Sequence, residues 1–285
     1  MKYVAIEEAF SIPELDHRQS PPWPENRFSS RSLADWARRL PDFTEFRLPE
    51  MDAVGIDVQV LSLTVPGLQG SQDAPAAQAD ARLANDYLAQ VIAAHPDRFR
   101  GFAALPMQDP SAAAAELARC VRELGFCRAL VNDHLQGHYL LYGATWSWAA
   151  EVGGHALRII YGGVFDRHPG ATLILGHMGE FLPFMRSRLD SRYHTLDLKA
   201  PLQRMPSAYL GSNVVITTSG VFSPAALTGA VLEIGADAVM FSVDYPYESS
   251  HEAVAGLERA TLSDTDRHKI AHRNAERILR LQLED

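Results

Sequence analysis

Side chains that can bind a cation or transfer a proton follow three short apolar runs in this chain of 285 residues. Glu7 and Glu8 end the first run. His177 and Glu180 follow a later one, and Asp244 closes the last. Carboxylate oxygens suit Mg²⁺ or Mn²⁺, and an imidazole nitrogen extends the choice to Zn²⁺ or Fe²⁺. Residues of these types predict a divalent metal site formed by Glu7, His177 and Asp244.

Each of these three residues also has an ordinary structural explanation. Glu7 could be a loop carboxylate, His177 a hydrogen-bonded core histidine, and Asp244 a turn residue before Tyr245 and Pro246. Ligand sites of parallel α/β proteins lie at the carboxyl ends of the strands. Three such residues at three different strand ends therefore favour the functional interpretation.

The apolar runs alternate with helical patterns along the whole chain. Seven runs predict strands, and their first residues are Tyr3, Val58, Phe99, Cys127, Ala171, Asn213 and Ala238. The helical patterns cover 32–39, 43–54, 76–94, 111–124, 144–161, 181–196, 224–234, 251–260 and 264–281. Ser111 is a candidate N-cap, and Gly55 a candidate C-cap.

Strands separated by helices predict parallel strands with right-handed crossovers. The runs are apolar on both faces, as expected when helices cover both sides of a sheet. We therefore predict one domain over residues 1–285, a TIM-type (β/α)8 barrel of which only seven core strands are evident. A doubly wound open sheet is the alternative.

Composition limits the partners and the compartment. A net charge of −9 argues against binding to nucleic acid or to an anionic membrane surface. No apolar run approaches the ~18 residues of a membrane-spanning helix, and the N-terminus has no apolar signal region. Two cysteines, Cys120 and Cys127, fit a reducing cytoplasm better than a disulfide framework.

Seven short motifs, in this order and spacing, resemble the metal-dependent decarboxylases of the amidohydrolase superfamily. The likeness is greatest to those that act on hydroxybenzoates such as 2,3-dihydroxybenzoate and γ-resorcylate. The motifs run nearly from end to end: AIEEAFSIPE at 5–14, RLPEMD at 47–52, GID at 55–57, GFAALP at 101–106, LGHMGE at 175–180, ITTSG at 216–220 and FSVDYPYE at 241–248.

The resemblance implies a (β/α)8 barrel with one divalent metal ion, Mn²⁺, Mg²⁺ or Zn²⁺. It implies that Glu7 and Asp244 are ligands, and that His177 lies beside the metal and is oriented by Glu180. It also implies that Arg188 reaches the substrate of a neighbouring subunit, so that the protein is a homodimer or homotetramer.

Two departures from the family stand out. Ala9 replaces a histidine of many members, as in the fungal-type form of the motif. A helix and a strand of the family, on the order of 40 residues including a ligand histidine, are missing after Leu140. Either His134 or His138 replaces the lost ligand, or the chain keeps the fold without the chemistry.

The resemblance implies non-oxidative decarboxylation of an ortho-hydroxybenzoate, a small aromatic carboxylic acid. Asp244 is then the candidate proton donor, assisted by His177 and Glu180, and Arg188 pairs with the anionic end of the acid. Three aromatic residues are candidate walls for the ring, although core packing explains them equally well: Phe10, Trp23 and Tyr245.

Two other functions stay open. The first is metal-assisted hydrolysis of an amide or lactone, which related enzymes perform with the same ligand types. The second is a catalytically silent barrel that acts only as a subunit partner, which the missing strand favours.

Overall fold

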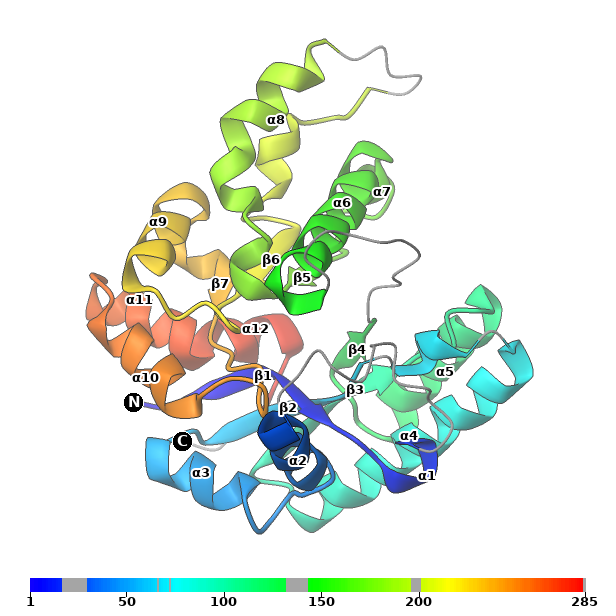
Figure 1. Cartoon of the computed structure of the whole chain (residues 1–285). Coiled ribbons are helices and arrows are strands. Elements are labelled where there is room, and N and C mark those ends of the chain that lie inside the picture. Colours follow the sequence, from blue (N-terminus) through cyan, green and yellow to red (C-terminus); the bar gives the residue numbers. More distant parts are fainter. Residues whose placement is uncertain (17–29, 66, 72, 132–142, 196–200, 284–285) are drawn as a thin grey trace. The chain divides into compact units, whose positions relative to one another are not determined.

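A computed structural model describes residues 1–16, 30–65, 67–71, 73–131, 143–195 and 201–283 (Figure 1). Its contacts divide the chain into two compact units. The carboxylate unit comprises Lys2–His134, Val243–His251 and Ala275–Asp285. The histidine unit comprises Met1, Leu135–Ser242 and Glu252–Asn274. The prediction of a single domain over residues 1–285 stays a prediction.

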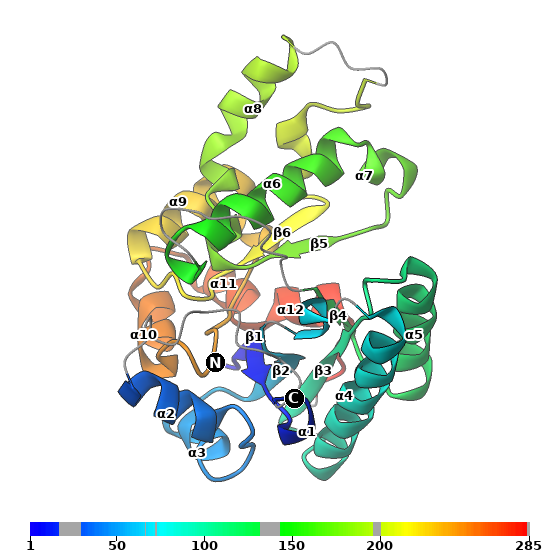
Figure 2. The ribbon, with the colours of Figure 1, turned by 45° about the vertical axis from the view of Figure 1, so that its right-hand side comes forward.

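The carboxylate unit is built on a four-stranded parallel sheet. Its strands follow the order of the sequence: β1 (Val4–Phe10), β2 (Val58–Leu63), β3 (Phe99–Ala104) and β4 (Arg128–Leu130). Its helical segments are α1 (Pro13–Asp16), α2 (Ser30–Arg39), α3 (Arg47–Val54), η1 (Gly67–Gly70), α4 (Ala74–Ala94) and α5 (Pro110–Glu123). Figures 1 and 2 show α4 and α5 side by side along β3 and β4.

The histidine unit is built on a three-stranded parallel sheet. Its strands are β5 (Leu173–Leu175), β6 (Val214–Thr217) and β7 (Val239–Met240). The α-helices that lie within it are α6 (Ser147–Tyr161), α7 (Val164–Arg167), α8 (Arg186–Tyr193), α9 (Pro224–Ile234) and α11 (Asp264–His268). Short 3₁₀ turns join them: η2 (Gly143–Thr145), η3 (His177–Gly179), η4 (Leu182–Met185), η5 (Pro206–Tyr209) and η6 (Ala236–Ala238). The boundary between the units falls within α10 (Ser250–Arg259) and at the start of α12 (Asn274–Leu279).

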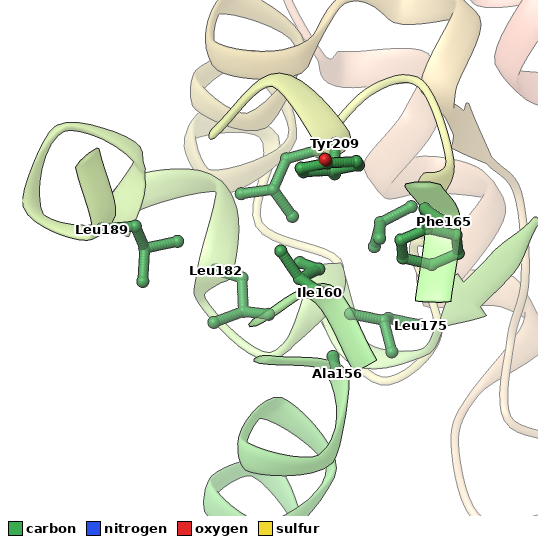
Figure 3. Close-up of a cluster of buried hydrophobic side chains, with 9 residues drawn as sticks. Ala156, Ile160, Phe165, Leu175, Leu182, Leu189 and Tyr209 are labelled. Carbon is green, nitrogen blue, oxygen red and sulfur yellow. The ribbon is translucent and has the colours of Figure 1, made fainter. Parts of the chain in front are cut away.

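An apolar core holds α6, α7 and α8 to this second sheet (Figure 3). The ring of Tyr209 stacks on that of Phe165 with 5.9 Å between their centroids. Ile160 of α6 and Leu175 of β5 are also buried there. The apolar residues that recur along α6 thus bury one face of the helix against the strands.

The seven predicted strands are confirmed, and so is their parallel pairing. The predicted C-cap Gly55 is also confirmed, with a φ of +76° and an N–H that donates to the carbonyl of Met51. The predicted N-cap Ser111 is wrong. Asp109 caps α5 instead, because its carboxylate accepts the N–H groups of Ser111 and Ala112.

Two predicted helices are divided. The pattern at 181–196 begins as the 3₁₀ turn η4 and becomes α-helical only in α8, because Glu180 and Phe181 before it are left-handed. The pattern at 264–281 is interrupted by a π-helical turn, Lys269–Arg273, between α11 and α12. Both patterns carried the helical period, and neither carried a signal for the interruption.

Candidate active site

A β-bulge in β1 places the glutamate pair. Ala5 pairs with Gln59 and Glu8 with Leu61, so two residues of β1, Ile6 and Glu7, lie opposite one residue of β2. Bulges bend a strand and redirect its side chains, and they are frequent beside active sites. Here the bulge lies at the carboxylate that the sequence predicts as a metal ligand.

The two glutamates have different surroundings. The Glu8 side chain is fully buried, and its two oxygens accept the N–H groups of Val243 and Tyr245, each at 3.0 Å. Glu7 is only half-buried. Burial raises the pKa of Glu8 to about 8, although the two N–H groups oppose the rise. Both oxygens of Glu8 are therefore engaged by the backbone, which leaves Glu7 as the ligand candidate of the pair.

Asp244 lies between the two N–H groups that Glu8 accepts. Its backbone is left-handed, with a φ of +78°, an uncommon conformation for a residue other than glycine. The Ala9 N–H donates to the Tyr245 carbonyl at 2.7 Å. Three hydrogen bonds thus hold residues 243–245 against the end of β1, and they bring the backbones of Glu7 and Asp244 to the same strand end.

His177 begins a loop with an unusual backbone in the histidine unit. Five consecutive residues have φ between +47° and +70°: His177, Met178, Gly179, Glu180 and Phe181. Four of them are not glycine, so the loop stores conformational strain of the kind that gathers at functional sites. A Cβ on Gly179 would lie 2.5 Å from Cγ2 of Ile216, and the loop therefore needs glycine there.

The imidazole of His177 has a fixed partner. Its Nδ1 lies 3.0 Å from Oε1 of Glu180, whose side chain is only 3% exposed, and the His177 N–H donates to Oγ of Ser219 at 3.0 Å. A hydrogen bond at one ring nitrogen sets what the other can do. The His177 side chain is 37% exposed, and Nε2 is the ring nitrogen that Glu180 does not engage.

The predicted metal set is divided between the units. Glu7 and Asp244 lie in the carboxylate unit and His177 in the histidine unit. Over the described ranges, no group of three His, Cys, Asp or Glu side chains is close enough to hold a metal ion. Two carboxylates at one strand end are oxygen donors of the type that Mn²⁺ and Mg²⁺ take, so the residues fit such an ion. His134 and His138 lie outside the described residues.

The predicted substrate contacts fall in different surroundings. Phe10 is 1% exposed, and its ring centroid lies 6.0 Å from that of Phe43. Tyr245 is also 1% exposed, and the guanidinium of Arg47 lies over its ring. Core packing thus accounts for both rings, and their role as substrate walls stays a prediction. Arg188 is exposed on α8, and Trp23 lies outside the described residues.

Three residues with defined roles in this geometry were not among the predicted site residues: Glu8, Arg47 and Ser219. A signal existed for Glu8, because neighbouring strand residues point to opposite faces and only one of two glutamates can face a ligand. Arg47 lies in a recognised motif, but its burial cannot be read from that motif. Ser219 follows a strand end, and only the three-dimensional structure connects it to His177.

A family model described as Amidohydrolase matches residues 15–281. This chain belongs to that family. The γ-resorcylate decarboxylase of Polaromonas sp. is 38% identical over 98% of both chains, and that of Rhodococcus jostii is 37% identical over the same shares.

Solved structures of similar proteins agree with this assignment. A 2,6-dihydroxybenzoate decarboxylase in complex with 2,6-dihydroxybenzoate has a TM-score of 0.90, 38% identity and coverage of 99% of this chain and all of its own. A dihydroxybenzoic acid decarboxylase from Polaromonas, with bound manganese and 2-nitroresorcinol, has a TM-score of 0.90 and 36% identity, over 98% of this chain and 97% of its own. The predicted fold class, a TIM-type α/β barrel, is confirmed by this likeness.

The alignment lengths show that the relatives carry positions that this chain lacks. The alignment with the Polaromonas enzyme runs over 330 positions, 45 more than the 285 residues of this chain, so at least 45 positions have no counterpart here. That length accommodates the missing helix and strand. The described residues form seven strands, one fewer than a complete eight-stranded barrel has.

Proposed function

We propose that this protein is a metal-dependent, non-oxidative decarboxylase of an ortho-hydroxybenzoate-type acid. The observation that most supports this proposal is that Glu7 and Asp244 lie at one strand end. The chain is also 38% identical to a γ-resorcylate decarboxylase over 98% of its length. The solved relatives bind 2,6-dihydroxybenzoate in one structure and manganese in another, which supports this substrate class and one divalent ion.

Glu7 and Asp244 would hold the ion, and a contribution from His177 stays a prediction. When bound, it supplies a Lewis acid and a template for the carboxylate and the adjacent phenol oxygen of the substrate. Asp244 gives a proton to the ring carbon that bears the carboxylate. The bond from that carbon to the carboxylate then breaks, its electrons return to the ring, and CO₂ leaves.

His177 would steer the proton or hold the phenol oxygen through Nε2. Glu180 supports this role because it accepts a hydrogen bond from Nδ1 in the tautomer that leaves Nε2 unprotonated. A positioned imidazole of this kind contributes typically about 10²–10⁴-fold to a proton-transfer step. Glu180 therefore acts through His177.

The proposal also covers the oligomeric state and the cellular compartment. We propose a homodimer or homotetramer in which Arg188, exposed on α8, pairs with the anionic end of the acid in a neighbouring subunit. Phe10, Trp23 and Tyr245 remain candidate ring contacts. No helix in the described ranges is long and apolar enough to cross a membrane. The two buried free thiols, Cys120 and Cys127, favour the cytoplasm.

The test is an assay of the Mn²⁺-loaded protein with 2,3- and 2,6-dihydroxybenzoate, in which CO₂ and the decarboxylated phenol are both measured. Equal amounts of the two products are expected, and loss of both in Glu7→Gln. Glu123→Gln, at an exposed position at the end of α5, is the matched control and keeps full activity.

Two alternatives give different results in the same assay. A hydrolase would release acid from lactones or amides and leave both dihydroxybenzoates intact. The absence of at least 45 positions from this chain favours a catalytically silent barrel. Such a protein would be folded but would bind no metal, and it would act on neither the dihydroxybenzoates nor the lactones and amides. Either result would contradict the proposed function.

A further inference from the structure

Arg47, the first residue of the RLPEMD motif, is fully buried in the carboxylate unit. Its Nη2 donates to the Ala9 carbonyl at 2.5 Å, its Nη1 to Oε1 of Gln59 at 3.1 Å, and its Nε to the Asp42 carbonyl at 3.2 Å. The guanidinium also lies over the ring of Tyr245, 4.3 Å from its centroid. The proposed reaction gives this residue no task.

Burying a guanidinium is costly unless its donors are paired and its charge is compensated. Burial lowers the pKa of Arg47 to about 10, while the nearby Tyr245, Glu8 and Asp42 oppose that fall. An apolar residue of similar volume would avoid this cost. The contacts of Arg47 indicate what it does instead, because it holds Ala9, two residues after Glu7, and Tyr245, directly after Asp244.

Glu8 holds the same backbone from a second direction. Its oxygens accept the N–H groups on both sides of Asp244, while the Ala9 N–H donates to the Tyr245 carbonyl. The N–H groups of the residues on either side of Asp244 are therefore fixed by one side chain. Arg47 fixes the carbonyl of Ala9 and the Tyr245 ring, so the two buried side chains act on the same two segments.

We propose that Glu8 and Arg47 form a buried brace that sets the positions of the Glu7 and Asp244 carboxylates for the metal ion. Both are positioning residues, because each acts on the backbone beside a ligand. The inference rests on the proposed function for its metal. The brace itself also has a direct readout, the protection of the two amides that Glu8 binds.

The experiment compares Glu8→Gln, Glu8→Ala and Arg47→Lys with matched controls from a partly buried ion pair in the same unit. Glu116 is 4% exposed and pairs with Arg119 at 2.7 Å, and it also accepts hydrogen bonds from Asn85 and Cys120. Glu116→Gln and Arg119→Lys remove equivalent interactions from α5. Any general loss of stability therefore appears in both sets.

Two readouts are measured on each folded full-length variant. The first is Mn²⁺ affinity, from the EPR signal of the free ion. The second is hydrogen exchange of residues 243–247 in the metal-free protein, followed by mass spectrometry. Loss of residues that orient ligands typically weakens metal binding about 10- to 100-fold. We expect that loss in the three brace variants, least in Glu8→Gln, with faster exchange at 243–247 in both Glu8 variants.

Each outcome decides the proposal. Weaker Mn²⁺ binding in the brace variants, with unchanged binding in the controls, supports it. Unchanged binding in Glu8→Ala and Arg47→Lys overturns it. If the wild-type protein binds no Mn²⁺, the proposed function fails, and exchange alone decides the brace: unchanged exchange at 243–247 in Glu8→Ala overturns it, and faster exchange there but not in Glu116→Gln supports it.

Discussion

The carboxylate unit and the histidine unit position their candidate groups by different means. In the first, the N–H groups of Val243 and Tyr245, on either side of Asp244, donate to the buried side chain of Glu8, and Arg47 lies over the ring of Tyr245. In the second, His177 opens a run of five left-handed residues, and one hydroxyl group, that of Ser219, accepts its backbone N–H. Hydrogen bonds to buried polar side chains shape one region, and backbone conformation shapes the other.

This difference predicts different sensitivities. Changes that remove charge or a hydrogen-bonding oxygen should damage the carboxylate unit, whereas a single added methyl group should damage the loop after β5. Such a contrast separates ligand positioning by electrostatics from positioning by steric fit.

The largest expected effect is that of Asp244→Asn on decarboxylation. The amide has no proton to give at the acidity of a carboxyl group and is a weaker metal ligand, so kcat should fall about 10²–10⁴-fold. Turnover is measured with saturating Mn²⁺ and substrate. The Glu123→Gln control keeps its activity, and an Asp244→Asn protein with wild-type kcat would refute the proposed proton donor.

The next effect is on stability, for Gly179→Ala. Alanine there would have a left-handed backbone, which costs about 1–2 kcal/mol of folding free energy. Its Cβ would also lie 2.5 Å from Cγ2 of Ile216, and overpacking of this kind costs about 1–3 kcal/mol more. Gly55→Ala is the control, because Gly55 has a φ of +76° but no heavy atom within 4 Å of the added Cβ. Urea unfolding should therefore give the larger loss for Gly179→Ala, and equal losses would contradict the steric account of the loop.

The smallest expected effect is that of Asp42→Ala, in the turn before α3 that supports Arg47. The carboxylate accepts four backbone N–H groups, those of residues 44–47. Burial alone would raise the pKa of Asp42, but the four hydrogen bonds together lower it below 3.8. Loss of a carboxylate that binds backbone N–H groups at the start of a helix costs about 1 kcal/mol at neutral pH.

The pH dependence of that cost has a definite sign. A lowered folded pKa gives stability that is fully present above pH 3.8 and is lost as the pH falls through the folded value. The difference in unfolding free energy between wild type and Asp42→Ala should therefore shrink below pH 3.8. A difference that stays constant down to pH 2 would contradict the role of the charged carboxylate.

Much of the fold could be predicted because its strands are short and apolar on both faces. The ranges 58–63 and 224–234 agree with β2 and α9 at both ends. The start of α8 could not be predicted, because Glu180 and Phe181 are residues that ordinarily avoid a positive φ. Only Gly179 carried a signal for that loop.

The sequence predicted the candidate ligands of the site better than the residues that hold them in place. Glu7 and Asp244 follow strand ends, and the sequence therefore exposes them as candidates. The burial of Glu8 and Arg47 depends on contacts between positions far apart in the chain, such as Glu8 with Val243. No local pattern reveals that a charge is buried and paired, so these residues required the structure.

The most direct test of the central claim, that Glu7 and Asp244 hold one divalent ion, is a titration of chelator-treated wild-type protein with Mn²⁺, followed by EPR of the free ion. The account predicts saturation near one ion per chain at micromolar affinity, with that binding lost in Glu7→Gln and retained in Glu123→Gln. A folded wild-type protein that binds no Mn²⁺ up to millimolar concentration would contradict it, and would mean that the missing helix and strand removed the site.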